Sequence, residues 1–347
     1  NADGLIQSEI TNVPRLDYTD GTCPTLLTEP ASTNLLHNSG WEGGGALPTD
    51  WSYGNSGGTS TPVISTRGTI IKAYRFQTSS ARHSFNRNTT SVSGTTYTLS
   101  VYVESITGSS QFNSILYRVG GGGTDIFKKD GVVVSSTEGV VAGSFYSITF
   151  TSNAVQTIEF RVGLGVIGDV TGDVTISQPQ LETLAYRTSF MISAIGAIAT
   201  RSADTGVISG DLSSYINSSE GVLEIKAKAL FNGGNDCRIT LSNGTNNNRV
   251  GLIWFSSPNN TSVIVQKDAT TVVNPNLNID QTLMTTFKIK WKSGDIQVKV
   301  NGTVVFTDTS TFSELILDQL SFSKGTETNF FQGNVQYIKV YDSVTDF

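Results

Sequence analysis

Apolar and polar residues alternate along most of the chain, and this alternation predicts β-strands with one buried and one polar face. The clearest alternating segments are residues 97–103, 146–150 and 158–164 in the first half, and residues 223–229, 287–292 and 296–300 in the second half. Asp130-Gly131 and Asn301-Gly302 stand between such segments and predict two-residue hairpin turns. The pattern predicts an all-β fold.

The alternating segments form two blocks on either side of the stretch Gln180–Asp204, whose composition differs from theirs. A chain of 347 residues is long enough for two domains. We therefore expect two tandem antiparallel β-sandwiches (jelly rolls), at residues 36–184 and 205–347, with a linker over residues 185–204.

Residues 1–35 have little periodicity, and Pro14, Pro24 and Pro30 favour an extended chain. Several leucines in this stretch are costly to leave in water. We expect an extended N-terminal arm that packs along a neighbouring domain or subunit.

The composition argues against some classes of function. Only 15% of the residues are charged, 37% are hydrophobic, and the formal net charge is -6. An acidic chain without a cluster of Lys and Arg is not expected to bind nucleic acid, and no apolar run is long enough to insert in a membrane. Cys23 and Cys237 fall in different predicted domains, so we expect no disulfide between them.

The residues that would support an enzymatic reaction are missing from the sequence pattern. Polysaccharide hydrolysis needs two carboxylates that face each other across the scissile bond, and no strand carries them at a suitable spacing. The two histidines, His37 and His83, stand beside Asn and Ser and suggest surface or turn positions. No Gly-x-Ser-x-Gly elbow, P-loop or Cys/His metal cluster is found. We therefore expect that the protein is not an enzyme.

Aromatic residues in polar loops are better candidates for ligand contacts, because a flat ring can stack on the C–H face of a sugar. The candidate carbohydrate-binding residues are Trp41, Trp51, Tyr53, Trp254, Phe255 and Asn259. The alternative for Trp41 and Trp51 is a position as lids over the core. Trp291 fits the buried face of its strand.

Three segments resemble known families. Gln180-Leu181-Glu182, Thr188-Ser189 and Thr200-Arg201 with Ala203-Asp204 resemble a segment of tail-fibre and spike proteins of bacteriophages, although Phe190 replaces a usual Tyr and Ser193 a usual Pro-Thr pair. Residues 38–51 resemble the start of a carbohydrate-binding-module jelly roll. Residues 291–302 and 333–341 resemble a concanavalin A-like, or laminin-G-like, lectin domain, in which the last strand would pair near Leu223–Ala229.

The resemblance implies a virion fibre or spike that recognises a bacterial cell-surface polysaccharide without cleaving it. It implies a homotrimer at the virion surface, assembled in the host cytoplasm and in contact with other virion proteins. The alternative is the non-catalytic, carbohydrate-binding part of a secreted or virion polysaccharide-degrading enzyme; a third is a purely structural part without a ligand.

No cofactor is expected. Both resembled folds often hold a structural calcium through loop oxygens. Asp169 and Asp173 are the candidate ligands, although no fixed-spacing signature supports them.

Overall fold

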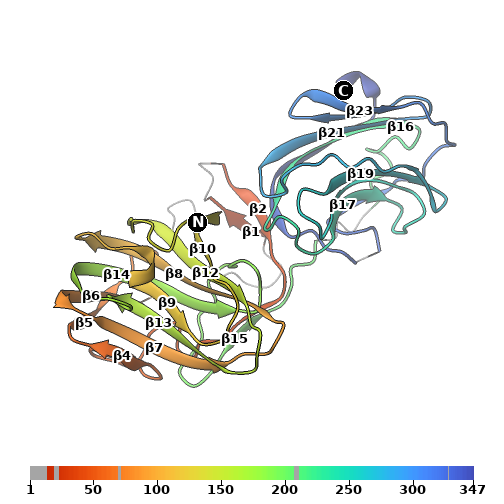
Figure 1. The fold of residues 1–347 in the computed structure, drawn as a ribbon. Coiled ribbons are helices and arrows are strands. Elements are labelled where there is room, and N and C mark those ends of the chain that lie inside the picture. Colours follow the sequence, from red (N-terminus) through yellow and green to blue (C-terminus); the bar gives the residue numbers. More distant parts are fainter. Residues whose placement is uncertain (1–13, 19–22, 69–71, 207–210, 327) are drawn as a thin grey trace. The chain divides into compact units, whose positions relative to one another are not determined.

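The computed structural model describes residues 14–18, 23–68, 72–206, 211–326 and 328–347, and this part of the chain is all-β, as predicted (Figure 1). It divides into two compact units, each with its own hydrophobic core. The first sandwich is Ala31–Ser202, and the second sandwich combines the described residues up to Pro30 with Ala203–Phe347. No described helix is long and apolar enough to cross a membrane.

The first sandwich consists of two large antiparallel sheets (Figure 1). The seven-stranded sheet has the order β11 (Val132–Val133), β10 (Ile126–Lys129), β12 (Ser144–Thr151), β8 (Thr96–Thr107), β14 (Val170–Glu182), β6 (Lys72–Ala81) and β5 (Thr59–Ile64). The four-stranded sheet has the order β4 (Ser52–Ser56), β7 (His83–Thr90), β13 (Thr157–Leu164) and β9 (Leu116–Val119). A short helix, α1 (Phe112–Ile115), precedes β9, and β3 (Ser32–Asn34) pairs separately with β15 (Ala199–Arg201).

The predicted alternation in β8, β12 and β13 is confirmed, because the apolar residues of these strands lie in the core of the first sandwich. The other side of β8 departs from the prediction of a solvated face. Thr98, Ser100 and Tyr102 are also buried. Thr98 Oγ1 donates a hydrogen bond to the carbonyl of Leu184 at 2.7 Å. The segment after β14 therefore returns over this face.

Much of the segment expected to be a linker packs against the first sandwich through the buried carboxylate of Glu182. This carboxylate accepts hydrogen bonds from Ser32 Oγ at 2.6 Å, Gln180 Nε2 at 2.7 Å and the Thr188 amide at 2.9 Å. The Met191 amide donates to Gln180 Oε1 at 2.8 Å. Buried polar groups are stable only when they are hydrogen-bonded, so residues 188–191 are fixed in place.

The second sandwich also consists of two antiparallel sheets. One has the order β1 (Arg15–Asp17), β2 (Thr25–Thr28), β25 (Gly333–Tyr341), β16 (Glu220–Ala229), β21 (Thr285–Lys292), β22 (Ile296–Val300) and β23 (Thr303–Asp308). The other has the order β20 (Thr270–Val273), β19 (Thr261–Lys267), β18 (Arg249–Trp254), β17 (Cys237–Ser242) and β24 (Gln319–Ser321). A 3₁₀ turn, η1 (Val344–Asp346), follows β25.

Several local predictions for the strands are confirmed. Asn301 and Gly302 join β22 to β23 with φ angles of 48° and 84°, and Asp130 and Gly131 join β10 to β11 with φ angles of 48° and 85°. The last strand, β25, pairs with β16 as expected.

The described part of the N-terminal arm forms strands rather than a free extension. Leu26 lies opposite Val335, and Thr28 lies opposite Gly333, so that β2 continues the sheet beyond β25 of the same chain (Figure 1). Leu26 also packs against the core of the second sandwich. The arm therefore protects an edge of this sheet. Residues 1–13 and 19–22 of the predicted arm lie outside the described residues.

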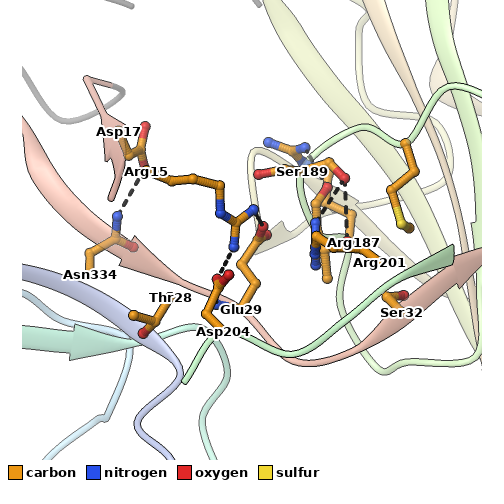
Figure 2. A network of polar contacts seen from close by, with 12 residues as sticks. Arg15, Asp17, Thr28, Glu29, Ser32, Arg187, Ser189, Arg201, Asp204 and Asn334 are labelled. Carbon is orange, nitrogen blue, oxygen red and sulfur yellow. Dashed lines mark hydrogen bonds and ion pairs between the residues drawn. The ribbon is translucent and has the colours of Figure 1, made fainter. Parts of the chain in front are cut away.

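An ion cluster holds the arm at the start of the C-terminal segment (Figure 2). Arg15 contacts the carboxylates of both Glu29 and Asp204. The amide of Glu29 donates to Asp204 Oδ2 at 2.7 Å, and the amide of Asp204 donates to the carbonyl of Glu29 at 2.9 Å. Burial alone would lower the pKa of Arg15, but the two carboxylates outweigh it and raise that pKa.

The prediction that the cysteines fall in different domains is wrong, because the arm joins the second sandwich. Cys23 and Cys237 both belong to this unit, and both thiols are free. Cys237 is buried in the core, and burial raises the pKa of its thiol to about 12.

Deletion of residues 1–30 should destabilise the second sandwich alone. It removes the pairing of β2 and the ion cluster, and a loss of about 2 kcal/mol corresponds to a fall in melting temperature of roughly 5 °C in a domain of this size. Differential scanning calorimetry should show a lower melting temperature for the second sandwich and an unchanged melting temperature for the first. Tyr215→Ala, which removes an exposed side chain of the same sandwich, is the control and should change neither. An unchanged melting temperature of the second sandwich after deletion of residues 1–30 would contradict this role of the arm.

Candidate functional site

The structure places Trp41 and Trp51 in the core of the first sandwich, which is the alternative to a ligand contact that the sequence left open. Trp41 is fully buried, and its ring packs edge-on against Trp51, Tyr74 and Phe85 at centroid distances of 5.7, 5.4 and 6.1 Å. Trp51 is 4% exposed, and its Nε1 donates to the carbonyl of Asn38 at 3.0 Å. Large rings stabilise a sheet-on-sheet core by the area that they bury. Neither ring offers a free face to a ligand.

Trp254 is likewise in the core of the second sandwich, 1% exposed and 4.7 Å from the ring of Phe331. The loop after it keeps the other two candidates at the surface: Phe255 is half-buried and Asn259 is exposed. Asn259 and Asn232 bond each other, with 2.7 Å between Asn232 Nδ2 and Asn259 Oδ1. This polar pair holds the loop itself together.

Tyr53 is 40% exposed, but it lies on the edge strand β4 opposite Phe85, which points into the core. Its ring neighbours His83 at 5.3 Å. Burial lowers the pKa of His83. Tyr53 therefore covers the rim of the core in which Trp41 and Trp51 are buried.

The two candidate calcium ligands are each engaged by an arginine. Asp169 accepts a hydrogen bond from Arg82 Nε at 2.8 Å, and Asp173 accepts one from Arg75 Nε at 3.2 Å. A guanidinium occupies the place that a cation would need. Among the described residues no group of three or more His, Cys, Asp or Glu side chains is arranged to hold a metal.

The outer face of the four-stranded sheet presents a different set of side chains. Phe85, Phe160 and Val162 point into the core, so the residues between them point outward. Outward-facing residues on these strands are Asn55 on β4, Ser84, Asn86 and Asn88 on β7, Glu159 and Arg161 on β13, and Tyr117 and Val119 on β9. We call this set the polar face.

The centre of the polar face is a fixed network of side chains. Arg161 lies between Asn86 on one neighbouring strand and Tyr117 on the other. Glu159 accepts hydrogen bonds from Arg161 Nε at 2.9 Å, from Arg161 Nη2 at 3.0 Å and from Asn86 Nδ2 at 2.6 Å. The hydrogen bonds from Arg161, followed by that from Asn86, outweigh burial and lower the pKa of Glu159.

One end of the polar face has a floor of small residues. Ser84 and Gly163 lie opposite each other, and Asn55 Nδ2 donates to Ser84 Oγ at 3.2 Å. A Cβ atom on Gly54 would come within 2.8 Å of Ser84 Oγ. At the centre, Oδ1 of Asn86 has no hydrogen-bond partner in the described part of the chain.

The sequence pattern alone does not identify this site, although it predicts the alternation of Glu159 and Arg161 with the apolar residues of β13. That pattern identifies an outward face but does not show which strands flank it. Asn86 and Tyr117 join it only through the pairing of β7, β13 and β9.

No protein-family model matches the chain, and no curated protein matches it. Among solved structures, a protein from Bacteroides ovatus described as a "putative carbohydrate binding protein" is similar with 13% identity and a TM-score of 0.28, covering 75% of each chain. Domains LG4-5 of the mouse laminin α1 chain are similar with 12% identity and a TM-score of 0.27, covering 72% of this chain and 83% of that chain. These likenesses are too distant to assign a function.

Replacement of a buried tryptophan should lower the stability of the protein instead of weakening ligand binding selectively. Trp51→Ala should lower the free energy of unfolding by about 3–5 kcal/mol, because it leaves a cavity in the core. Tyr53→Ala, at the exposed rim, is the control and should cost about 1 kcal/mol or less. Urea unfolding of the two variants checks this, and equal effects would contradict the burial of Trp51.

The network around Glu159 should make stability depend on pH. Its pKa is lowered below the ordinary value of 4.5, so the stabilisation is fully present above that value and is lost as the pH falls through the folded-state pKa. In the Glu159→Gln variant the side chain at this position does not titrate. The difference in unfolding free energy between the native protein and Glu159→Gln should therefore shrink on acidification below pH 4.5. Urea unfolding between neutral and acid pH measures it, and a difference independent of pH would rule out the network.

Proposed function

We propose that the protein binds a glycan on the polar face of the first sandwich. The observation that carries this proposal is the row formed by Tyr117, Arg161 and Asn86 on adjacent strands. An aromatic ring can stack on the C–H face of a sugar, while amide and guanidinium groups bond its hydroxyls and fix its orientation.

The proposal is one of binding without cleavage. A general acid for glycoside hydrolysis needs a carboxyl group with a raised pKa. Glu159, the carboxylate at the centre of the polar face, has a lowered pKa and is engaged by Arg161 and Asn86. It is ionised at neutral pH and positions these donors instead of supplying a proton.

The finer assignment remains a prediction from the sequence resemblance: a fibre or spike at the surface of a bacteriophage, a homotrimer, and a bacterial surface polysaccharide as ligand. Stacking on one sugar is weak, and three copies on one particle would raise the affinity through effective concentration. The alternative remains the carbohydrate-binding part of a polysaccharide-degrading enzyme. A monomer mass by light scattering at micromolar concentration would count against the homotrimer.

Replacement of Tyr117 or Arg161 on the polar face should weaken binding of the glycan. Tyr117→Ala and Arg161→Ala should each reduce affinity about tenfold, because one good polar or stacking contact is worth about 1–2 kcal/mol. Glycan-array screening followed by isothermal titration calorimetry with the best ligand measures this effect.

Two variants control for general damage and for surface charge. Arg82→Ala removes an exposed arginine of the first sandwich, and Tyr215→Ala removes an exposed tyrosine of the second sandwich. Both should bind as the native protein does. Equal binding by all four variants would refute the polar face as the site. Release of new reducing ends from the bound polysaccharide would refute binding without cleavage.

A further inference from the structure

Three basic side chains converge on the outer face of the five-stranded sheet of the second sandwich. Ile239 and Leu241 of β17 and Leu252 of β18 point into the core, so Arg238 and Arg249 point outward on neighbouring strands. Arg249 Nη1 donates to the carbonyl of Lys324 at 3.5 Å. We call Arg238, Arg249 and Lys324 the cation cluster.

A glycine stands between the positions of the two arginines on this face. Gly251 of β18 lies opposite Thr240, between the position of Arg249 and that of Ile253, which is paired with Arg238. A Cβ atom on Gly251 would come within 2.6 Å of the carbonyl of Ile239. Position 251 therefore adds no side chain to the outer face between Arg238 and Arg249.

The cation cluster has no counter-charge in direct contact. No carboxylate of the described residues lies within ion-pair distance of any of its three members. Arg249 is 6% exposed and is held by a neutral group, with Nε donating to Gln266 Oε1 at 2.7 Å. Asp236 acts on Arg238 only at longer range.

The side chain of Arg238 is left without any hydrogen bond. Its Nε is buried and has no partner in the part of the chain that the structure describes. A guanidinium carries five N–H donors, and leaving a buried charged donor unpaired is costly. The donors of Arg238 are thus available to an acceptor that is not part of the chain.

The charges of the cluster oppose one another. Burial, followed by the charge of Arg238, lowers the pKa of Arg249 to about 10. Burial lowers the pKa of Lys324 first, and the charges of Arg238 and Arg249 lower it further. Such mutual repulsion in a protein with a formal net charge of -6 is relieved by a bound anion.

We propose that the cation cluster binds the carboxylate or sulfate group of an acidic saccharide. A guanidinium fork matches the two oxygens of such a group, and a cluster of three cations supplies the charge. This site goes beyond the polar face, because it lies in the other sandwich and does not rest on the proposed function there.

Titration of the full chain with acidic polymers tests the proposal. The probes are polygalacturonate for carboxylates, heparin for sulfates, dextran as a neutral polymer, and inorganic sulfate and phosphate as free anions. We expect one of the acidic polymers to bind and dextran not to do so at this site. Arg238→Gln and Lys324→Gln should each weaken that binding about tenfold, as for a hydrogen bond to a charged group.

Lys292→Gln is the matched control, because it removes one positive charge from the opposite sheet of the same sandwich, where Lys292 pairs with Glu220. It should keep its affinity for the acidic polymer. Tyr117→Ala should keep it as well, so that failure of this site is distinguished from failure of the polar face.

Thermal unfolding gives a second readout. Without polymer, Arg238→Gln should melt at the same temperature as the native protein or above it, because the repulsion is relieved. With polymer, the native protein should be stabilised and Arg238→Gln should not. The proposal is overturned if no acidic polymer binds, if Lys292→Gln loses as much affinity, if only the free anions bind, or if single-stranded DNA competes as the tighter ligand.

Discussion

The buried carboxylate of Glu182 is the group on which the organisation of the first sandwich depends. It stands at the end of β14 and accepts hydrogen bonds from Ser32 in β3, before the strands of the two large sheets, and from Thr188, after the last of those strands. A buried charge without such partners would cost several kcal/mol or more. Both ends of the domain are thereby fixed to the same point, and β3 and β15 pair with each other.

Because both ends of the first sandwich are fixed at one point, this sandwich can be inserted into the chain of the second sandwich. The second sandwich receives β1 and β2 from before the first sandwich and its other strands from after it. Glu29 and Asp204, on either side of the insertion, bond each other and share Arg15. The arm thus contributes to the sheet that its own chain completes some 300 residues later, since Leu26 lies opposite Val335.

Two kinds of positive surface must be distinguished in the second sandwich. The outer side of β21 carries several lysines, but Lys290 pairs with Asp295 and Lys292 with Glu220. Charge there is balanced within the chain. Arg238 and Arg249, on the other sheet, have no carboxylate in contact among the described residues. This imbalance, rather than the number of cations, is the basis of the proposed anion site.

The sequence by itself determined the strands, the inward faces and the Asn301-Gly302 and Asp130-Gly131 hairpins, because these depend on a two-residue period and on local φ preferences. It did not determine the fate of the aromatic residues: Trp51 stands among polar residues and Trp254 just before a polar loop, yet packing between sheets buries both. Only strand pairing brought Asn86 beside Arg161 and placed β2 beside β25. Partners in a sheet are chosen by contacts between segments far apart in the chain, and no local pattern encodes them.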